Sequence, residues 1–271
     1  MGEGFADPSG PIEKRPPGSL FDRPLLEVEK GFHIVLDTSV SYGWISGYVQ
    51  TPRGGAPSST SEKRPTLKEL GIDAATVFNI SLSASLDSHL LYGAAHLLDL
   101  NGENTLQENL VFHGKQYPAG TRVEADVTLN WYEIGYQYNI HFAKQGNLSI
   151  APTVAVALWD FSAQLQSDGI KDDRSYMKAT PRVGLEFKWA PLKKFLVTGK
   201  AVGSLPIQHL PGIYTLGLTG KYMLVNKDRF RILLGLGIGY DWMRFEDSQQ
   251  VPNRISANIG PLGVLGVEIE Y

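Results

Sequence analysis

The sequence predicts an all-β fold, and three observations support this prediction. From residue 31 onward, apolar and polar residues alternate with a period of two, which is typical of half-buried strands. The chain has no apolar run of about 20 residues, so a transmembrane helix is excluded. Its 271 residues include 29 Gly and 10% aromatic residues but only 20% charged residues, below the roughly 25% usual in soluble domains.

Composition excludes several classes of function. The chain has 25 Lys and Arg against 28 Asp and Glu, a formal net charge of −3, so it has no electrostatic footprint for a nucleic-acid partner. It has no Cys, which removes disulfide frameworks, Cys-ligated zinc, iron–sulfur clusters and thiol nucleophiles. Its 42% hydrophobic content and mean hydropathy of −0.14 resemble those of a soluble protein. We expect no cofactor.

The chain divides into two parts. Residues 1–30 sustain no period and contain Pro8, Pro11, Pro16, Pro17 and Pro24, so we interpret them as a Pro-rich N-terminal extension. Residues 31–271 form the β domain. Its first predicted strand runs from residue 31 to a loop that begins at Thr51. The others are expected at about 72–87, 89–100, 121–142, 148–166, 175–189, 195–205, 213–225, 229–245 and 254–271. Since the third and seventh are weakly patterned, eight or twelve strands remain alternatives to about ten.

Two of these strands change phase. In the fourth, the apolar residues move from the odd face to the even face after Trp131, and in the fifth the change follows Leu158. A tight turn at 143–146 would pair Trp131 with Leu158, so both changes would fall at the same level. We interpret this coincidence as a β-bulge or a break in register.

The polar face of the strands indicates which side meets water. It is mostly Ser, Gly, Ala, Thr and Asn, which suits a crowded barrel lumen better than a soluble surface. Aromatic residues gather toward the ends of the apolar face, as in the girdles of membrane barrels. The predicted girdle contains Tyr42, Trp44, Tyr48, Phe187, Trp189, Tyr240 and Trp242. The fold class is therefore a transmembrane antiparallel up-and-down β-barrel.

Loop lengths favour the same fold. Long segments at 51–71, 101–120, 167–174 and 246–253 and a medium one at 206–211 alternate with short turns, as in barrels with short periplasmic turns and longer outer loops. Within the first loop, Thr66 to Gly71 is expected to form one helical turn that ends at Gly71.

The last strand and one internal stretch carry a resemblance. Val267, Ile269 and Tyr271 form an alternating end that closes on an aromatic residue, and this end is similar to the insertion signal of bacterial outer-membrane β-barrel proteins. Residues 110–123 and 131–138 are similar to a segment of uncharacterised barrels of that class. The resemblance implies an integral protein of the Gram-negative outer membrane with both termini in the periplasm. It also implies export across the inner membrane. Because the first residues lack a secretory pattern, our hypothesis is that the sequence is that of the mature chain.

The resemblance also implies partners. We expect outer-membrane lipid and the barrel-assembly machinery to contact the chain, with a periplasmic or surface protein as a further candidate partner.

Charged residues on the polar face form the candidate site. We interpret them as ion pairs that fill a narrow lumen, and the alternative is the lining of a polar conduit. The predicted network contains Asp37, Glu133, Asp160, Lys178, Arg182, Glu186, Lys188, Lys200, Lys221, Arg231, Asp241 and Glu268, with Glu270 alongside.

No catalytic or metal-binding motif emerges. His96 with Asp99, together with His113 and His209, is the only raw material for a surface hydrolase. No two His stand at metal-ligand spacing, and Asp168, Asp172 and Asp173 fit a solvated turn better than a calcium loop.

The first functional hypothesis is a largely occluded barrel that acts as a structural or binding component through its outer loops or periplasmic tail. A narrow, porin-like pore for small solutes or ions and a surface-exposed protease or lipid deacylase are the alternatives.

Overall fold

The computed structural model describes residues 32–142, 147–167, 169–227 and 230–271. The predicted N-terminal extension lies outside these described residues. Among them, no helix has the length and apolar character needed to cross a membrane.

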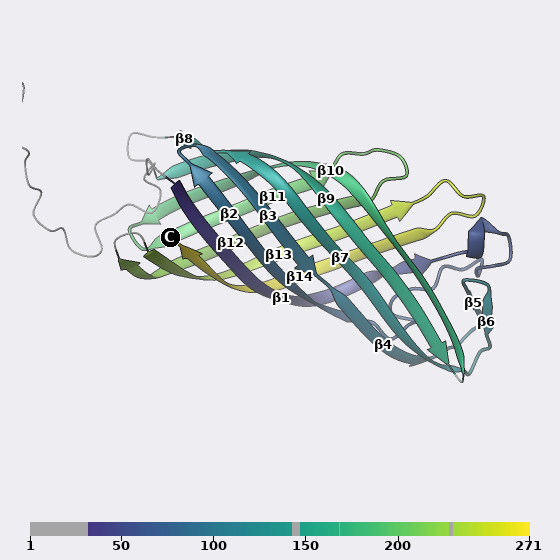
Figure 1. The fold of residues 1–271 in the computed structure, drawn as a ribbon. Helices are drawn as coiled ribbons and strands as arrows, with labels where there is room; N and C mark the ends of the chain where they lie inside the picture. The colour runs from purple at the N-terminus through teal and green to yellow at the C-terminus, as the bar shows by residue number, and fades with distance from the viewer. Residues whose placement is uncertain (1–31, 143–146, 168, 228–229) are drawn as a thin grey trace, which may run out of the picture.

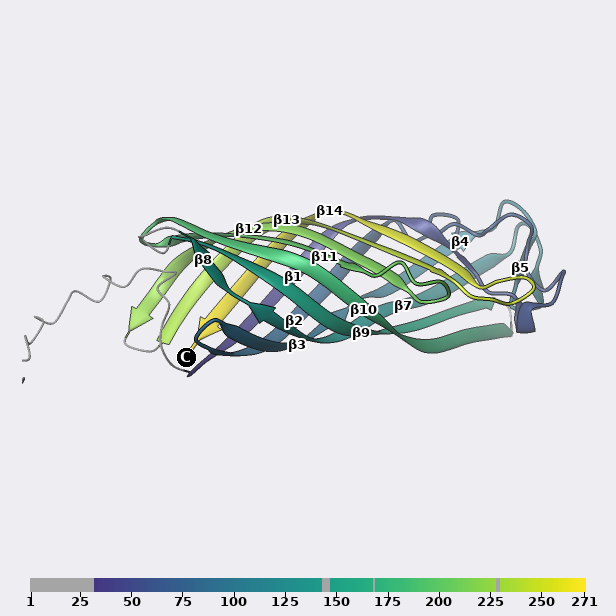
Figure 2. The same ribbon diagram turned by 90° about the horizontal axis from the view of Figure 1, so that it is seen from above.

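The described chain forms a closed antiparallel barrel of ten strands (Figures 1 and 2). Each strand pairs with its neighbour, and β14 pairs with β1 to close the ring. The strands are β1 (Phe32–Gln50), β2 (Ala74–Leu86), β3 (His89–Leu97), β4 (Asp99–Thr105), β7 (Arg122–Tyr138), β8 (Ile140–Phe142), β9 (Leu148–Ser167), β10 (Ile170–Leu192), β11 (Phe195–Ser204), β12 (Gly212–Lys227), β13 (Phe230–Glu246) and β14 (Arg254–Glu270). In the ring, β3 with β4 and β7 with β8 each count as one strand.

Two further strands lie outside the ring. They are β5 (Leu110–Phe112) and β6 (Lys115–Tyr117), which form a small hairpin. Figure 1 shows this hairpin at the end of the barrel that carries the long loops, opposite the end that carries the short turns and the C-terminus. A short 3-10 turn, η1 (Arg53–Gly55), lies in the first long loop. We call the part of the barrel toward the long loops the loop half, and the part toward the short turns and the C-terminus the turn half.

The interior and exterior exchange character between the two halves. In β7, odd residues point inward along the whole strand. In the loop half they are apolar, and Trp131 is 1% exposed. In the turn half the apolar residues instead lie on the outward face, where Ile134 is 70% exposed. The turn half therefore presents an apolar surface, whereas the loop half resembles a soluble barrel.

This exchange corrects the predicted bulge. β7 and β9 pair without a register shift from Glu124 opposite Gln166 to Gln137 opposite Thr153. Trp131 pairs with Trp159, one residue from the predicted Leu158. The strands do not change phase. Their surroundings change at the level of the two tryptophans, so the apolar residues move to the other face.

A register shift does occur in β14. The pairing of β14 with both β1 and β13 shifts between Ile259 and Leu262, so Ile255 and Ile259 point into the barrel while Leu265 and Val267 point out. Strict alternation in the sequence would instead place these four residues on one apolar face.

The connection between β9 and β10 also differs from prediction. We expect a long loop at 167–174, but β10 already begins at Ile170, and Lys171 to Arg174 pair with β9. Polar residues on both faces of this stretch conceal the strand in the sequence. Asp172 and Asp173 are therefore strand residues.

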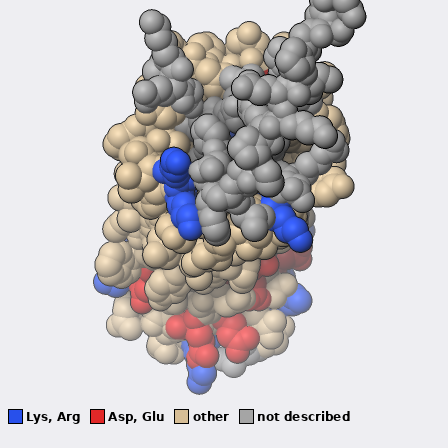
Figure 3. Space-filling model, turned by 90° about the vertical axis from the view of Figure 1, so that its left-hand side faces the viewer, with Lys and Arg blue, Asp and Glu red and all other residues tan. Residues whose placement is uncertain are grey.

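The exterior of the loop half carries acids. Asp99, Glu103, Glu124 and Asp126 are exposed on the adjacent strands β4 and β7. In the view from the turn end, Asp and Glu side chains gather in the lower part of the view (Figure 3).

Residues 65–73 of the first loop complete the wall where β2 ends short of its neighbours. Val49 N donates to Pro65 O at 3.1 Å, and Leu67 N donates to Gly47 O at 3.0 Å. On the other side, Asn104 Nδ2 of β4 donates to Glu69 O at 3.0 Å. The segment thus bridges β1 and β4.

The expected helical turn is present in this segment. Leu70 N donates to Thr66 O at 3.2 Å, and Glu69 N donates to Thr66 Oγ1 at 3.1 Å while Thr66 N donates to the Glu69 carboxylate at 2.9 Å. This is a capping box. Gly71, with φ of 80°, ends the turn in a left-handed conformation that glycine adopts without steric cost.

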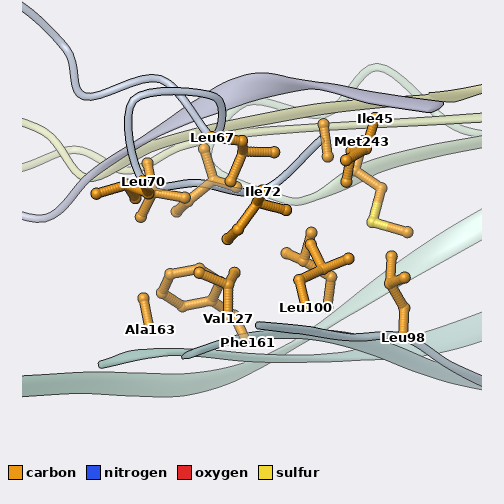
Figure 4. Packing of buried hydrophobic residues seen from close by; sticks show 14 of the residues in the cluster. Ile45, Leu67, Leu70, Ile72, Leu98, Leu100, Val127, Phe161, Ala163 and Met243 are labelled. Carbon is orange, nitrogen blue, oxygen red and sulfur yellow. The ribbon is translucent and has the colours of Figure 1, made fainter. Parts of the chain in front are cut away.

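The turn directs three apolar side chains into the barrel. Leu67, Leu70 and Ile72 are buried and face residues of β4, β7 and β9 such as Leu100, Val127 and Phe161 (Figure 4). They belong to one apolar cluster that includes residues of β1, β13 and β14. The cluster therefore reaches across the interior of the loop half.

Candidate functional site

The turn half contains a cavity of about 280 Å³, which we call the polar cavity. Its lining includes Ser, Thr and Asn side chains together with Asp, Glu and Lys from most of the strands. The barrel places them there because alternate residues of every strand point inward. Two groups of charged side chains lie around this cavity.

The first group surrounds Glu133 near the middle of the barrel. The Glu133 carboxylate is wholly buried and forms an ion pair with the equally buried Arg182 of β10. Lys200 Nζ of β11 lies 3.7 Å from its other oxygen. Arg182 also donates to Thr215 Oγ1 at 3.2 Å and to Val202 O at 3.4 Å. Two cations thus share one carboxylate, and neighbouring oxygens satisfy the guanidinium further.

His96 joins this group from β3. Its ring stacks on Trp131 with centroids 4.3 Å apart, its Nδ1 lies 2.6 Å from Asn79 Oδ1, and its Nε2 lies 4.0 Å from Glu133. Asn79 Nδ2 in turn donates to Ser39 Oγ at 3.2 Å. These contacts fix the ring between the cavity and the apolar cluster above it.

The second group lies nearer the turns. Lys221 Nζ contacts Asp37 Oδ2 and Glu268 Oε2, both at 2.6 Å. Lys188 Nζ lies 3.2 Å from Glu186 Oε1. The Lys221 contacts join β12 to β1 and β14, whereas Lys188 and Glu186 both belong to β10.

The remaining predicted charges that point inward have other surroundings. Arg231 contacts Glu270 at 3.4 Å at the turn end. Asp241 lines the cavity, and its Oδ1 is buried without a hydrogen-bond partner among the described residues. Lys178 points inward within the loop half, where its Nζ lies 6.0 Å from the centroid of the Phe245 ring.

Asp160 is not in the lumen. It pairs with Asn130 and Met177 on the face of β9 opposite the buried Trp159 and Phe161. The phase interpretation misplaced it, because the polar face of β9 turns outward in the loop half. Asn79 and Thr215, which hydrogen bond to the central group, were not singled out from the sequence, since uncharged polar residues are common along every strand.

The other histidines do not form the predicted combination. His96 points inward, whereas Asp99 lies on the exposed outer surface. His113, in the β5–β6 turn, contacts Asp172 of β10 at 3.1 Å, and this contact ties the hairpin to the barrel. His209 lies in the 205–211 loop. Within the described ranges, no group of three or more His, Asp or Glu has the arrangement of a metal site.

The predicted girdle residues are aromatic side chains on the outward face. Tyr42, Trp44, Tyr240, Phe187 and Trp189 are exposed there. Two others have specific partners: Trp242 stacks on Tyr214 at 5.1 Å, and Arg64 lies 4.8 Å from the Tyr48 ring centroid. At the end of β14, Tyr271 and Ile34 exchange two backbone hydrogen bonds of 2.9 Å.

A closed antiparallel barrel with an apolar outer band and a polar lumen defines the class of the protein. It is a transmembrane β-barrel of the outer-membrane type, and integral location in the outer membrane follows from this architecture. Comparison with protein-family models and with curated proteins gives no match.

Solved structures give matches to the fold. The chain is similar to the outer membrane protease OmpT from Escherichia coli, with 9% identity, a TM-score of 0.44 and coverage of 88% of this chain and 96% of that one. It is similar to the outer membrane protein OprG from Pseudomonas aeruginosa at 8% identity and a TM-score of 0.39, covering 90% and 97%. Ail of Yersinia pestis, the attachment invasion locus protein, matches at 10% identity and a TM-score of 0.36, covering 87% and 99%.

Proposed function

We propose that this protein is a non-conducting outer-membrane barrel that acts as a structural or binding component through its loop half. In this proposal the loop half faces the cell exterior, and both termini lie in the periplasm. The apolar band contacts outer-membrane lipid, and the strand end with Val267, Ile269 and Tyr271 engages the assembly machinery.

One observation carries the proposal. The apolar cluster of the loop half reaches across the barrel above the polar cavity. An ion that crossed it would lose its hydration without gaining polar partners, which is prohibitively costly. Below the cluster, many of the charged side chains that would line a conduit instead form ion pairs with one another.

Support for the two alternatives is narrower. The polar cavity would form the wide part of a narrow pore, but it lies beneath the apolar cluster. For a hydrolase, a His would have to contact an acid near the loops. His96 is separated from Asp99, so the candidate His–acid contact is that between His113 and Asp172.

Single-channel recording in planar bilayers tests the proposal. We expect no steady openings from the full chain. A variant with Leu67→Ser, Leu70→Ser and Ile72→Ser hydrates the interior of the loop half and is expected to conduct. Lys68→Ser changes an exposed residue of the same turn and is the matched control. Steady openings by the unmodified chain would overturn the proposal in favour of the pore.

A further inference from the structure

The barrel wall has two places where one strand ends before its neighbours. β2 begins only at Ala74, and residues 65–73 fill the gap beyond this end of the strand. β11 ends at Ser204 opposite Arg182, whereas β10 continues outward from Arg182 to Ile170. The 205–211 loop turns back at this level, where Leu205 N donates to Pro181 O at 2.9 Å.

The second gap leaves one edge of β10 unpaired. Residues 170–180 pair with β9 on one side, and on the other side the described chain supplies them with no strand partner. Such an edge is a template for another strand. We call residues 170–180 the open edge.

Three inward side chains of the open edge have a polar atom without a hydrogen-bond partner in the described part of the chain. Arg174 Nε, Tyr176 Oη and Thr180 Oγ1 are buried without a hydrogen-bond partner among the described residues. All three are even-numbered residues of β10, so their side chains lie on the same face of the strand and line one strip of the interior. A polar group beside this strip would satisfy them.

The charge of this strip is positive. The Arg174 guanidinium lies 5.8 Å from the Tyr176 ring centroid, and Lys178 Nζ lies 6.0 Å from that of Phe245. Both cations therefore rest on aromatic rings, and no carboxylate of the described residues forms an ion pair with either. The acid of this strip, Asp172, is held by His113.

Membrane geometry argues against a second copy as the occupant. Two barrels in one membrane are related by an axis along the membrane normal. That axis leaves the outward direction of β10 unchanged, so the two open edges could not pair antiparallel. A separate extended segment has no such restriction.

We propose that the open edge is a docking strand for an extended segment of a partner protein. The segment adds antiparallel to β10 and carries acidic residues opposite Arg174 and Lys178, with a residue between them that packs on Tyr176. This inference rests on the proposed function, because it specifies how the loop half would bind.

The probe is a fluorescent synthetic peptide, Thr-Glu-Thr-Val-Thr-Glu-Thr, and its counterpart has Lys in place of both Glu. Fluorescence anisotropy with the full chain in lipid nanodiscs is expected to show at least about tenfold tighter binding of the acidic peptide, a difference of roughly 1.4 kcal/mol. Arg174→Glu with Lys178→Glu should reverse the preference. Lys171→Glu, on the outward face of the same strand, is the matched control and should preserve it.

Backbone methylation distinguishes strand addition from simple charge attraction. N-methylation of the alternate peptide amides that face β10 should abolish binding, whereas methylation of the other set should leave it unchanged. The docking strand would be overturned if neither methylation pattern changed the binding, or if vesicles of phosphorylated lipid displaced the peptide. Either result would assign the cations to an anionic headgroup. Failure of the acidic peptide to bind would also overturn the docking strand.

Two controls separate the possible failures. Arg174→Gln with Lys178→Gln replaces the charge-reversed variant if that variant loses its heat-modifiable mobility on gels, and it should reduce the preference between the peptides to less than about twofold. Conductance is recorded from the same preparation. A chain that does not conduct and does not bind the peptide contradicts the open-edge proposal alone.

Discussion

The two halves of this barrel are built from the same strands, but they place polar and apolar side chains on opposite faces. In the turn half the exterior is apolar and the interior holds buried ion pairs. In the loop half the exterior is polar and the interior holds an apolar cluster. The hydrophobic effect stabilises an interior only where its alternative is water. In lipid, the apolar face is already satisfied outside, so the interior of the turn half depends on polar pairing.

This contrast explains where each half is closed. Around the apolar cluster, residues 65–73 complete the wall between β1 and β4. In the turn half, most described strand residues are paired on both sides, as lipid requires of backbone polar groups, although the short β8 pairs with β9 alone. The open edge of β10 lies in the loop half, where water can solvate backbone groups.

The largest expected effect tests the apolar side of the contrast. Phe161→Ala removes a ring that is 0% exposed in the cluster and should reduce the free energy of unfolding by about 3 to 5 kcal/mol. Phe78→Ala removes a ring that is 54% exposed on the outer band of β2 and should cost less than half as much. Urea unfolding in lipid vesicles, followed by tryptophan fluorescence, measures both. Equal losses would contradict the difference between the halves.

The next prediction concerns the polar interior. Glu133→Gln leaves the buried Arg182 without its carboxylate and should cost about 3 kcal/mol. Glu246→Gln breaks a 2.9 Å contact with Arg254 in the loop half. It should cost less than about 1 kcal/mol, since these side chains are partly exposed and water screens them. The same unfolding measurement compares them, and a similar cost for both would show that burial of Glu133 carries no penalty.

Sequence periodicity predicted the strands well because it depends on local alternation alone. It identifies which residues share a face, but it does not say which face meets lipid. At Trp131 and Trp159 the surroundings reverse while the backbone continues, so the pattern imitated a phase change and Asp160 was assigned to the wrong side. The unpaired edge of β10 was also out of reach, because it follows from where β11 ends relative to β10, which alternation does not encode.

The candidate site was predicted to a similar extent: the sequence indicates which charged residues point inward, but not which of them pair. Charges such as Glu133 and Lys221 stand out on a face of small residues, so their inward position could be expected. Their partners could not, because a contact such as that between Lys221 and Asp37 joins strands far apart in the chain. Register and closure decide those pairs.

The smallest expected effect tests the segment that completes the wall of the loop half. Partial burial alone would raise the pKa of Glu69, but Lys63 at 2.8 Å and the Thr66 backbone and hydroxyl outweigh it and hold that pKa below its ordinary value. A lowered pKa in the folded state gives stability that is present above the pKa of the unfolded chain and is lost as pH falls through the folded value. Because Glu69 is partly exposed, we expect a loss of about 0.5 kcal/mol. It should appear below about pH 4.5 as faster hydrogen exchange at Leu70 and Gly71. Glu69→Gln should remove this acid dependence, whereas Glu108→Gln, which alters only the weaker 3.4 Å contact of Lys63, should keep it. An acid response that persists in Glu69→Gln would place its origin elsewhere.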